Sequence, residues 1–142
     1  MRLLMSAPRE LVFFCDRDLG RQFPALLRDA GLRIQQHDDH FEPNTPDDEW
    51  IAEVGRRQWI AITRDARIRY SPLALSVLMQ SRARLFVLVG KLSTTEAAAA
   101  FLRWRDRISS MESEERGGFI AKVRRDGVYM WLREREWLKR RR

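Results

Sequence analysis

Acidic residues follow three segments that a parallel sheet would bring to one edge. Asp16 and Asp18 come after the apolar run 11–15, and Asp65 comes shortly after the apolar run 59–63. The trio Asp47-Asp48-Glu49 follows Thr45-Pro46 and begins a segment with helical spacing. In an open α/β sheet, ligands bind at the edge where the carboxyl ends of the strands meet. The sequence therefore predicts that these acids converge.

Several carboxylates at one edge repel each other unless a cation or a shared proton lies among them. Mg²⁺ and Mn²⁺ prefer oxygen ligands, and a carboxylate-held metal can activate water for phosphodiester cleavage without a serine or cysteine nucleophile. We expect Asp16, Asp65 and Glu49 or Asp48 to hold the metal and to be catalytic, with Asp18 assisting. Helix capping is the alternative explanation for Asp18 and for Asp47, which also suits the first turn of a helix.

The elements that must position these acids alternate along the chain. Apolar runs predict strands over residues 11–15, 32–36, 59–63 and 85–89, and helical spacing predicts helices over 19–30, from Pro46 onward with Thr45 as cap, from Pro72 onward, and over 95–108. This order predicts an α/β fold with a central parallel sheet and right-handed crossovers.

The C-terminal part has a different pattern. Two apolar segments, 118–123 and 128–132, flank Arg125-Asp126-Gly127, and Asp-Gly is a strong hairpin signal. A short basic helical tail follows. The net charge is +7 for the whole chain and +4 for its last ten residues, so the body is only mildly basic. Such a tail can bind phosphate backbones or an acidic protein, or it can simply be solvated.

Composition and length indicate a soluble globular chain with one core. The chain has 142 residues, of which 44% are hydrophobic and 33% charged, and no apolar run approaches the roughly 20 residues that span a bilayer. The first ten residues are too short and too soon charged for a signal peptide. Cys15 is the single cysteine, which excludes an internal disulfide and favours a core position. We expect a cytoplasmic protein.

Several segments together resemble a known family. They are Phe13-Phe14-Cys15-Asp16-Arg17-Asp18-Leu19-Gly20, His37-Asp38-Asp39-His40-Phe41, Thr45-Pro46-Asp47-Asp48-Glu49-Trp50, Ile62-Thr63-Arg64-Asp65-Ala66-Arg67-Ile68-Arg69 and Phe86-Val87-Leu88. Their order and spacing resemble the PIN-like domains of VapC-type toxins, over roughly residues 11–132. The resemblance implies a three-layer PIN-like nuclease domain over 11–110, with the hairpin and tail of 111–142 packed on the same domain.

The resemblance also implies a Mg²⁺- or Mn²⁺-dependent endoribonuclease, commonly the toxin of a type II toxin–antitoxin pair. Asp16 and Asp65 match the acids that follow two strands in the family, and Asp48 or Glu49 would match the acid from the intervening helix. Gly90 and Lys91 stand where a fourth acid would follow the strand 85–89, so Asp18 is the candidate for that place. A cognate antitoxin is the expected partner, and the apolar residues of the hairpin could form its docking surface or that of a homodimer.

Basic and aromatic residues complete the set of candidates. We expect Arg17, Arg64, Arg67, Arg69 and Lys91 to contact RNA, although arginines beside carboxylates can equally pair with them. The polar segment from His37 to His40 is expected to be a solvated loop. Trp50 and Trp59 are expected to pack in the core, whereas Trp131 and Trp137 could stack on bases or be buried by a partner chain.

Two other classes of function stay open. Asp16-Arg17-Asp18 after a strand resembles the start of haloacid-dehalogenase-type phosphatases, with Thr63 and Lys91 as further candidates, and receiver domains have a similar topology. Both expect groups that this chain does not supply at the corresponding places: a late acidic pair in the first and a serine or threonine at Val89-Gly90 in the second. The third alternative is a non-catalytic module in which the acids hold a structural ion.

Overall fold

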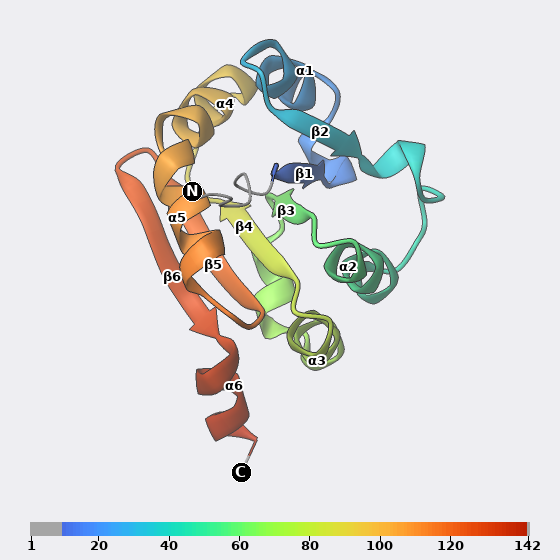
Figure 1. Cartoon of the computed structure of the whole chain (residues 1–142). Helices are drawn as coiled ribbons and strands as arrows, with labels where there is room; N and C mark the ends of the chain where they lie inside the picture. Colours follow the sequence, from blue (N-terminus) through green and yellow to red (C-terminus); the bar gives the residue numbers. More distant parts are fainter. Residues whose placement is uncertain (1–9, 142) are drawn as a thin grey trace, which may run out of the picture.

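A six-stranded sheet with helices on both faces forms the centre of the molecule (Figure 1). The computed structural model describes residues 10–141. The strands are β1 (Val12–Cys15), β2 (Arg33–Gln36), β3 (Ile60–Thr63), β4 (Arg84–Leu88), β5 (Phe119–Arg124) and β6 (Gly127–Arg133), in the order β2-β1-β3-β4-β5-β6. The first five are parallel and β6 is antiparallel to β5. The predicted α/β fold with a C-terminal hairpin is confirmed.

The helices cover the two faces of the sheet in separate groups (Figure 1). One face carries α1 (Gln22–Asp29), α4 (Thr94–Arg103) and α5 (Arg105–Glu114), and the other carries α2 (Asp47–Arg56) and α3 (Pro72–Gln80). A short helix, α6 (Glu134–Arg140), follows β6. None of the helices within the described residues combines the length and apolar character needed to cross a bilayer.

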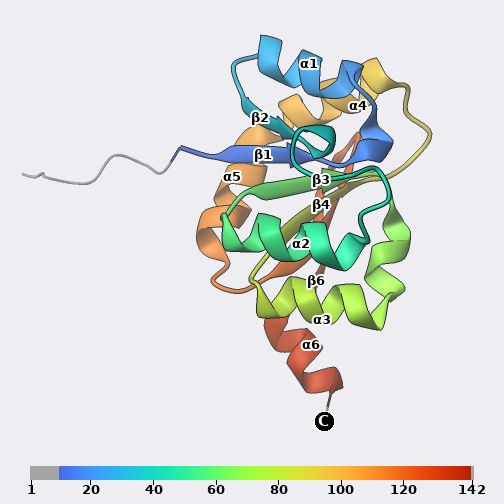
Figure 2. The ribbon, with the colours of Figure 1, turned by 90° about the vertical axis from the view of Figure 1, so that its right-hand side faces the viewer.

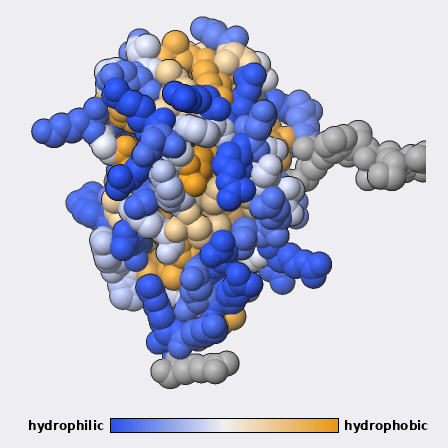
Figure 3. Space-filling view, turned by 90° about the vertical axis from the view of Figure 1, so that its left-hand side faces the viewer, coloured by the Kyte–Doolittle hydropathy of each residue, from blue (hydrophilic) through white to orange (hydrophobic). Residues whose placement is uncertain are grey.

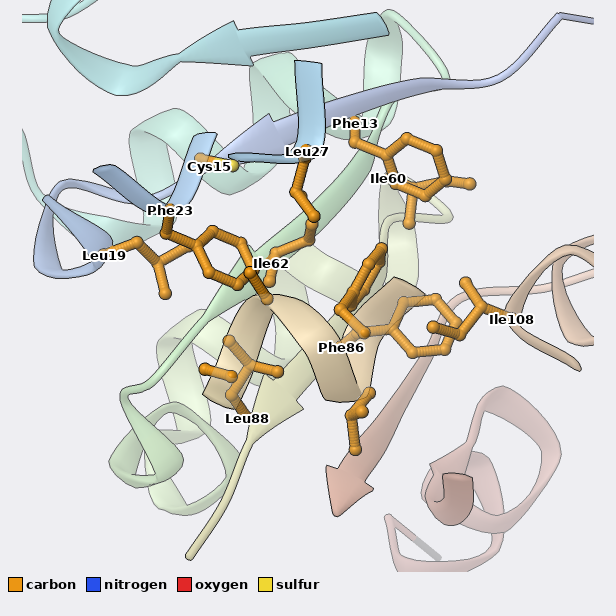
Figure 4. Packing of buried hydrophobic residues seen from close by; sticks show 14 of the residues in the cluster. Phe13, Cys15, Leu19, Phe23, Leu27, Ile60, Ile62, Phe86, Leu88 and Ile108 are labelled. Carbon is orange, nitrogen blue, oxygen red and sulfur yellow. The ribbon is translucent and has the colours of Figure 1, made fainter. Parts of the chain in front are cut away.

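Each face of the sheet has its own hydrophobic core because successive strand residues point to opposite sides. Phe13 and Cys15 pack with residues of α1, α4 and α5 (Figure 4), whereas Phe14 packs with Trp50 and the rest of the α2–α3 side. Cys15 is buried as expected, and burial raises the pKa of its thiol to about 12. A thiol in this state is a packing group.

Three local predictions were wrong. The helix expected over 95–108 is two helices that meet at Trp104, whose indole Nε1 donates to Arg125 O in the hairpin turn at 3.1 Å. Helix α2 begins at Asp47 after Pro46, while the Thr45 hydroxyl donates to Glu42 O instead of capping the helix. Trp137 is buried against this chain's own α2–α3 core and needs no partner for its burial.

The carboxyl ends of the parallel strands meet at one edge of the sheet, on the right of Figure 2. The segments after β1 and β3 and the N-terminus of α2 all lie along this edge (Figure 2). The fold therefore brings the predicted acids to a common place.

The side of the molecule around β6 and α5 is largely hydrophilic, with small apolar patches between the charged side chains (Figure 3).

Candidate active site

Strands β1 and β3 position two of the predicted acids directly. They pair with Cys15 opposite Ile62, and Asp16 N continues the ladder by donating to Ile62 O at 3.0 Å. The chain then turns into a 3-10 helix, where an Asp16 carboxylate oxygen accepts from Arg17 N at 2.7 Å. Asp65 caps a second 3-10 helix, Ala66–Tyr70, that follows β3. Both acids therefore stand where a buried strand turns into a short helix.

The hydroxyl of Thr63 connects the acids of the two strands. Thr63 Oγ1 lies 2.8 Å from Asp16 Oδ2 and 3.1 Å from Asp18 Oδ2, and it accepts from Asp65 N at 3.0 Å. Arg64 N donates to Asp18 Oδ2 at 3.1 Å. Since one hydroxyl has one proton, it can satisfy only one of the two carboxylates fully at a time. From the sequence, Thr63 was a candidate only for the alternative phosphatase function, although its place at the end of an apolar run, two residues before Asp65, was the available signal.

The two acids after β1 resist ionisation in this arrangement. Burial raises the pKa of Asp16, which the hydrogen bonds from Thr63 and Arg17 oppose and the charges of Asp47 and Asp65 reinforce. Burial and the Asp16 charge raise the pKa of Asp18 to about 6. Crowded carboxylates with raised pKa values are stabilised in their charged form by a nearby cation.

Asp65 is held differently, by an arginine. Arg67 Nε lies 2.9 Å from Asp65 Oδ1 and Arg67 Nη2 lies 3.1 Å from Asp65 Oδ2, and the Arg67 backbone N also donates to Oδ1. These hydrogen bonds lower the pKa of Asp65. The Arg67 side chain is 91% exposed, so it can leave the carboxylate without disturbing the core.

A cleft of about 550 Å³ contains four aspartates and three arginines: Asp16, Asp18, Asp47, Asp65, Arg17, Arg64 and Arg67. The acid that α2 contributes to its lining is Asp47, whose Oδ1 accepts from Trp50 Nε1 at 2.9 Å. Asp48 and Glu49 do not border the cleft, so their catalytic and metal-binding roles stay predictions. From the sequence, Asp48 or Glu49 was the expected acid, because Asp47 can be explained by the preference of the first helical turn for acids.

His37 also lines the cleft, and the expectation of a solvated position was wrong for it. The ring is 3% exposed and lies against Phe14, Phe41 and Trp50. Burial lowers its pKa, and Nδ1 has no hydrogen-bond partner within the described residues, with Asp38 Oδ1 at 3.7 Å. His40 is exposed and lies 2.7 Å from Gln35 Oε1.

The predicted RNA-binding cations have different surroundings. Arg17 Nε pairs with Asp38 Oδ1 at 3.1 Å, and Arg64 Nη2 donates to Leu92 O at 3.1 Å. Arg69 lies over the rings of Tyr70 and Trp131, outside the cleft. Lys91 lines a separate hollow of about 690 Å³ with four other basic or aromatic residues, Arg103, Trp104, Arg124 and Arg125. Only Arg17, Arg64 and Arg67 border the acids.

The residues of the cleft fit a hard divalent cation by their chemistry. As the side chains stand, no three carboxylates, imidazoles or thiols in residues 10–141 are grouped closely enough to hold an ion. The donors are nevertheless carboxylate oxygens, which Mg²⁺ and Mn²⁺ prefer, and the raised pKa values of Asp16 and Asp18 reflect charge that a cation would offset. Arg67 currently occupies both oxygens of the third acid.

Comparisons with known proteins give one family match and one relative. A family model described as "PIN like domain" matches residues 11–90, more than half of the chain. A protein of Mycobacterium tuberculosis named "Putative ribonuclease VapC45" is 37% identical over 78 residues, which are 51% of this chain and 56% of that protein. The chain thus spans little more than half the length of this relative. No solved structure matches the chain.

Proposed function

Because this chain belongs to the PIN-like domain family, we propose that it is a metal-dependent endoribonuclease. The observation that carries the proposal is the cleft lined by Asp16, Asp18, Asp47 and Asp65, in which the first two carboxylates share the Thr63 hydroxyl. The named ribonuclease among its relatives supports the substrate class. The family match also favours this function over the phosphatase, receiver and structural-ion alternatives.

Mg²⁺ or Mn²⁺ would be held by Asp16 and Asp65, with Asp18 assisting and one acid from the start of α2. Asp47 is the best candidate for that acid by its position, and Glu49 and Asp48 are the alternatives. When bound, the cation supplies an activated water and offsets the charge that develops on the leaving oxygen. Because Thr63 Oγ1 accepts from Asp65 N–H, the hydroxyl proton of Thr63 would point toward Asp16 and Asp18.

The arginines of the cleft rim are suited to phosphate. Arg67 would exchange the Asp65 carboxylate for an RNA phosphate, and Arg17 and Arg64 would contact the neighbouring backbone, since guanidinium groups bind both anions in the same forked geometry. Such contacts position RNA without selecting its sequence. Lys91 and the basic tail would extend the contact along the surface.

A nuclease of this kind needs restraint in the cell. By analogy with the VapC name of the relative, we propose that the chain is the toxin of a type II pair, acts in the cytoplasm and is bound by a cognate antitoxin. The β5–β6 hairpin is the proposed docking element, with the partly buried Val128 and Met130 on one face of the sheet and Trp131 on the other. A homodimer through the hairpin is the alternative.

The test is cleavage of labelled total RNA and transfer RNA with Mg²⁺, with Mn²⁺ and with EDTA. Asp16→Asn and Asp65→Asn should each reduce cleavage by about 100-fold or more, since loss of an outer-shell partner alone costs about 10–100-fold. Glu53→Gln is the matched control, because Glu53 pairs with Arg56 and Arg57 on α2 away from the cleft. Cleavage that survives both aspartate variants, or that persists in EDTA, would contradict the proposal.

The same assay identifies the acid that α2 contributes. Asp47→Asn should remove metal-dependent cleavage, whereas Asp48→Asn and Glu49→Gln should retain it. Loss of cleavage in Asp48→Asn or Glu49→Gln, with cleavage retained in Asp47→Asn, would instead identify Asp48 or Glu49 as the metal-binding acid of α2.

A further inference from the structure

Five side chains outside the cleft form a continuous series of alternating rings and cations, here called the ladder: Tyr70, Arg69, Trp131, Lys122 and Tyr129. Arg69 Cζ lies 4.7 Å from the ring centroid of Tyr70 and 4.3 Å from that of Trp131. Lys122 Nζ lies 5.4 Å from the ring centroid of Trp131 and 5.8 Å from that of Tyr129. Each cation therefore lies between two rings.

The ladder begins beside the acidic cleft and ends on the hairpin. The 3-10 helix Ala66–Tyr70 carries Arg67, which lines the cleft, and two residues later Arg69, which begins the ladder. Lys122 on β5 pairs directly with Tyr129 on β6, which places them side by side on one face of the sheet. This short helix therefore connects the lining of the cleft to the ladder.

The ladder is open to solvent and carries positive charge. Tyr70 is 69% exposed and Tyr129 is 42% exposed, and they are two of the four exposed large hydrophobic residues in the part of the chain that is described. A hollow of about 290 Å³ lies over its hairpin end, between Lys122, Arg124, Tyr129, Met130 and Trp131, without a carboxylate in its lining. Within residues 10–141, neither Arg69 nor Lys122 forms an ion pair, so their charge is available to a ligand.

We propose that the ladder is a second RNA-binding site that holds a single-stranded segment of the substrate next to the acidic cleft. Unpaired bases stack on exposed aromatic faces and on guanidinium planes, and backbone phosphates pair with cations, so alternating rings and cations match both parts of a nucleotide. A duplex hides its base faces and gains only the phosphate contacts. The inference rests on the proposed function for the identity of the substrate.

The first experiment measures binding in EDTA, apart from cleavage, by the fluorescence anisotropy of a short labelled RNA. Tyr70→Ala and Tyr129→Ala should each weaken single-strand binding about tenfold, the usual effect of removing one stacking ring. Both rings are exposed, so the variants should keep the melting temperature of the parent. Tyr70→Phe and Tyr129→Phe retain the ring face and should bind like the parent, as should Leu138→Ala, which removes an exposed apolar side chain from α6.

The charge of the ladder is tested with a matched pair. Lys122→Gln should weaken binding and reduce its salt dependence. Arg33→Gln, which removes an exposed cation from β2 at the opposite edge of the sheet, should change neither. The parent, Tyr70→Ala and Tyr129→Ala proteins should all bind a duplex of the same sequence with the same affinity. The proposal would be overturned if the two tyrosine-to-alanine variants lost affinity equally for duplex and single-stranded RNA. It would also be overturned if they bound single-stranded RNA like the parent.

Two outcomes separate this proposal from its alternatives. If the alanine variants keep RNA affinity but lose binding to a polyglutamate peptide, the ladder serves an acidic protein partner and the RNA proposal is wrong. If single-stranded RNA binds through the ladder but is never cleaved with Mg²⁺ or Mn²⁺, the ladder proposal stands and the nuclease proposal falls. Metal-dependent cleavage together with unchanged RNA affinity in the ladder variants overturns the ladder alone.

Discussion

Thr63 shows how one neutral side chain can organise several charged ones. Its hydroxyl accepts from Asp65 N and faces both Asp16 and Asp18, so these two acids, 47 and 45 positions before it in the sequence, share its one proton. The hydroxyl is buried and the strand that carries it is fully buried, which keeps its rotamer and position constant. The distance between the acids after β1 and the acid after β3 therefore depends on this side chain.

Arg67 competes with a cation for Asp65. We predict that Arg67→Gln binds Mn²⁺ more tightly than the parent in the absence of RNA, by at most about fivefold, because the metal no longer displaces an exposed ion pair, which contributes little. Isothermal titration of the purified variant with Mn²⁺ measures the change. Arg56→Gln, which removes an exposed arginine pairing with Glu53 away from the cleft, is the control and should bind Mn²⁺ like the parent. Unchanged or weaker binding by Arg67→Gln would contradict the competition.

Asp18 makes the stability of the metal-free protein depend on pH. Its pKa rises from 3.8 to about 6 on folding, so its contribution to stability is fully present below about pH 4 and is lost as the pH rises through 6. In EDTA at pH 7.5, Asp18→Asn should raise the melting temperature by about 2–4 °C, a small shift because the side chain is only partly removed from solvent, which screens part of its charge.

The pH dependence separates this effect from a general stabilisation. At pH 4 the Asp18→Asn variant and the parent should melt together, and Glu42→Gln, which neutralises an exposed acid outside the cleft, should show no pH-dependent gain. A gain of the same size at both pH values would mean that ionisation is not its cause.

At the scale of elements, the helices decide which residues of a motif reach the cleft. The sequence predicts the start of α2 within one residue, but the choice among Asp47, Asp48 and Glu49 depends on the rotation of the helix, which the packing of Trp50 and Ile51 against the sheet determines. A shift of one residue turns a helical side chain by about 100°. Similarly, nothing local to residues 95–108 predicts the break at Trp104, because its hydrogen-bond partner lies in the distant hairpin turn.

The contact between α2 and α3 depends on a glycine. A Cβ added at Gly55 would lie 2.7 Å from the backbone O and 2.5 Å from Oγ of Ser81, just past the end of α3. The backbone of Ser81 can move away only at a cost in free energy. Gly55→Ala should therefore lower the melting temperature by about 3–6 °C, even though alanine has a helix propensity about 1 kcal/mol more favourable than glycine. The same substitution in a Ser81→Ala background should still destabilise, because the carbonyl contact remains. Thermal unfolding of the four proteins tests this, and a stabilised Gly55→Ala protein would contradict the crowding.

For the whole molecule, the features that follow from the order of strands and helices could be predicted from the sequence. Asp16 and Asp65 meet because parallel strands share an edge, and this placement needs only the alternation of apolar runs and helical segments. The burial of His37 and the ladder could not be predicted, because they depend on side chains from distant segments packing together. The domain division near residue 110 stays a prediction, although β5 and β6 continue the same sheet as β1 to β4.

The central place of β1 and β3 bears on how the cleft can be controlled. Each is flanked by a strand on both sides, and their amides belong to the part of the sheet that opens only when the molecule unfolds. Slow hydrogen exchange is therefore expected up to and including the amide of Asp16, which donates to Ile62 O, and local melting cannot switch the site off. Control of such a long-lived site has to come from a molecule that occupies or covers the cleft.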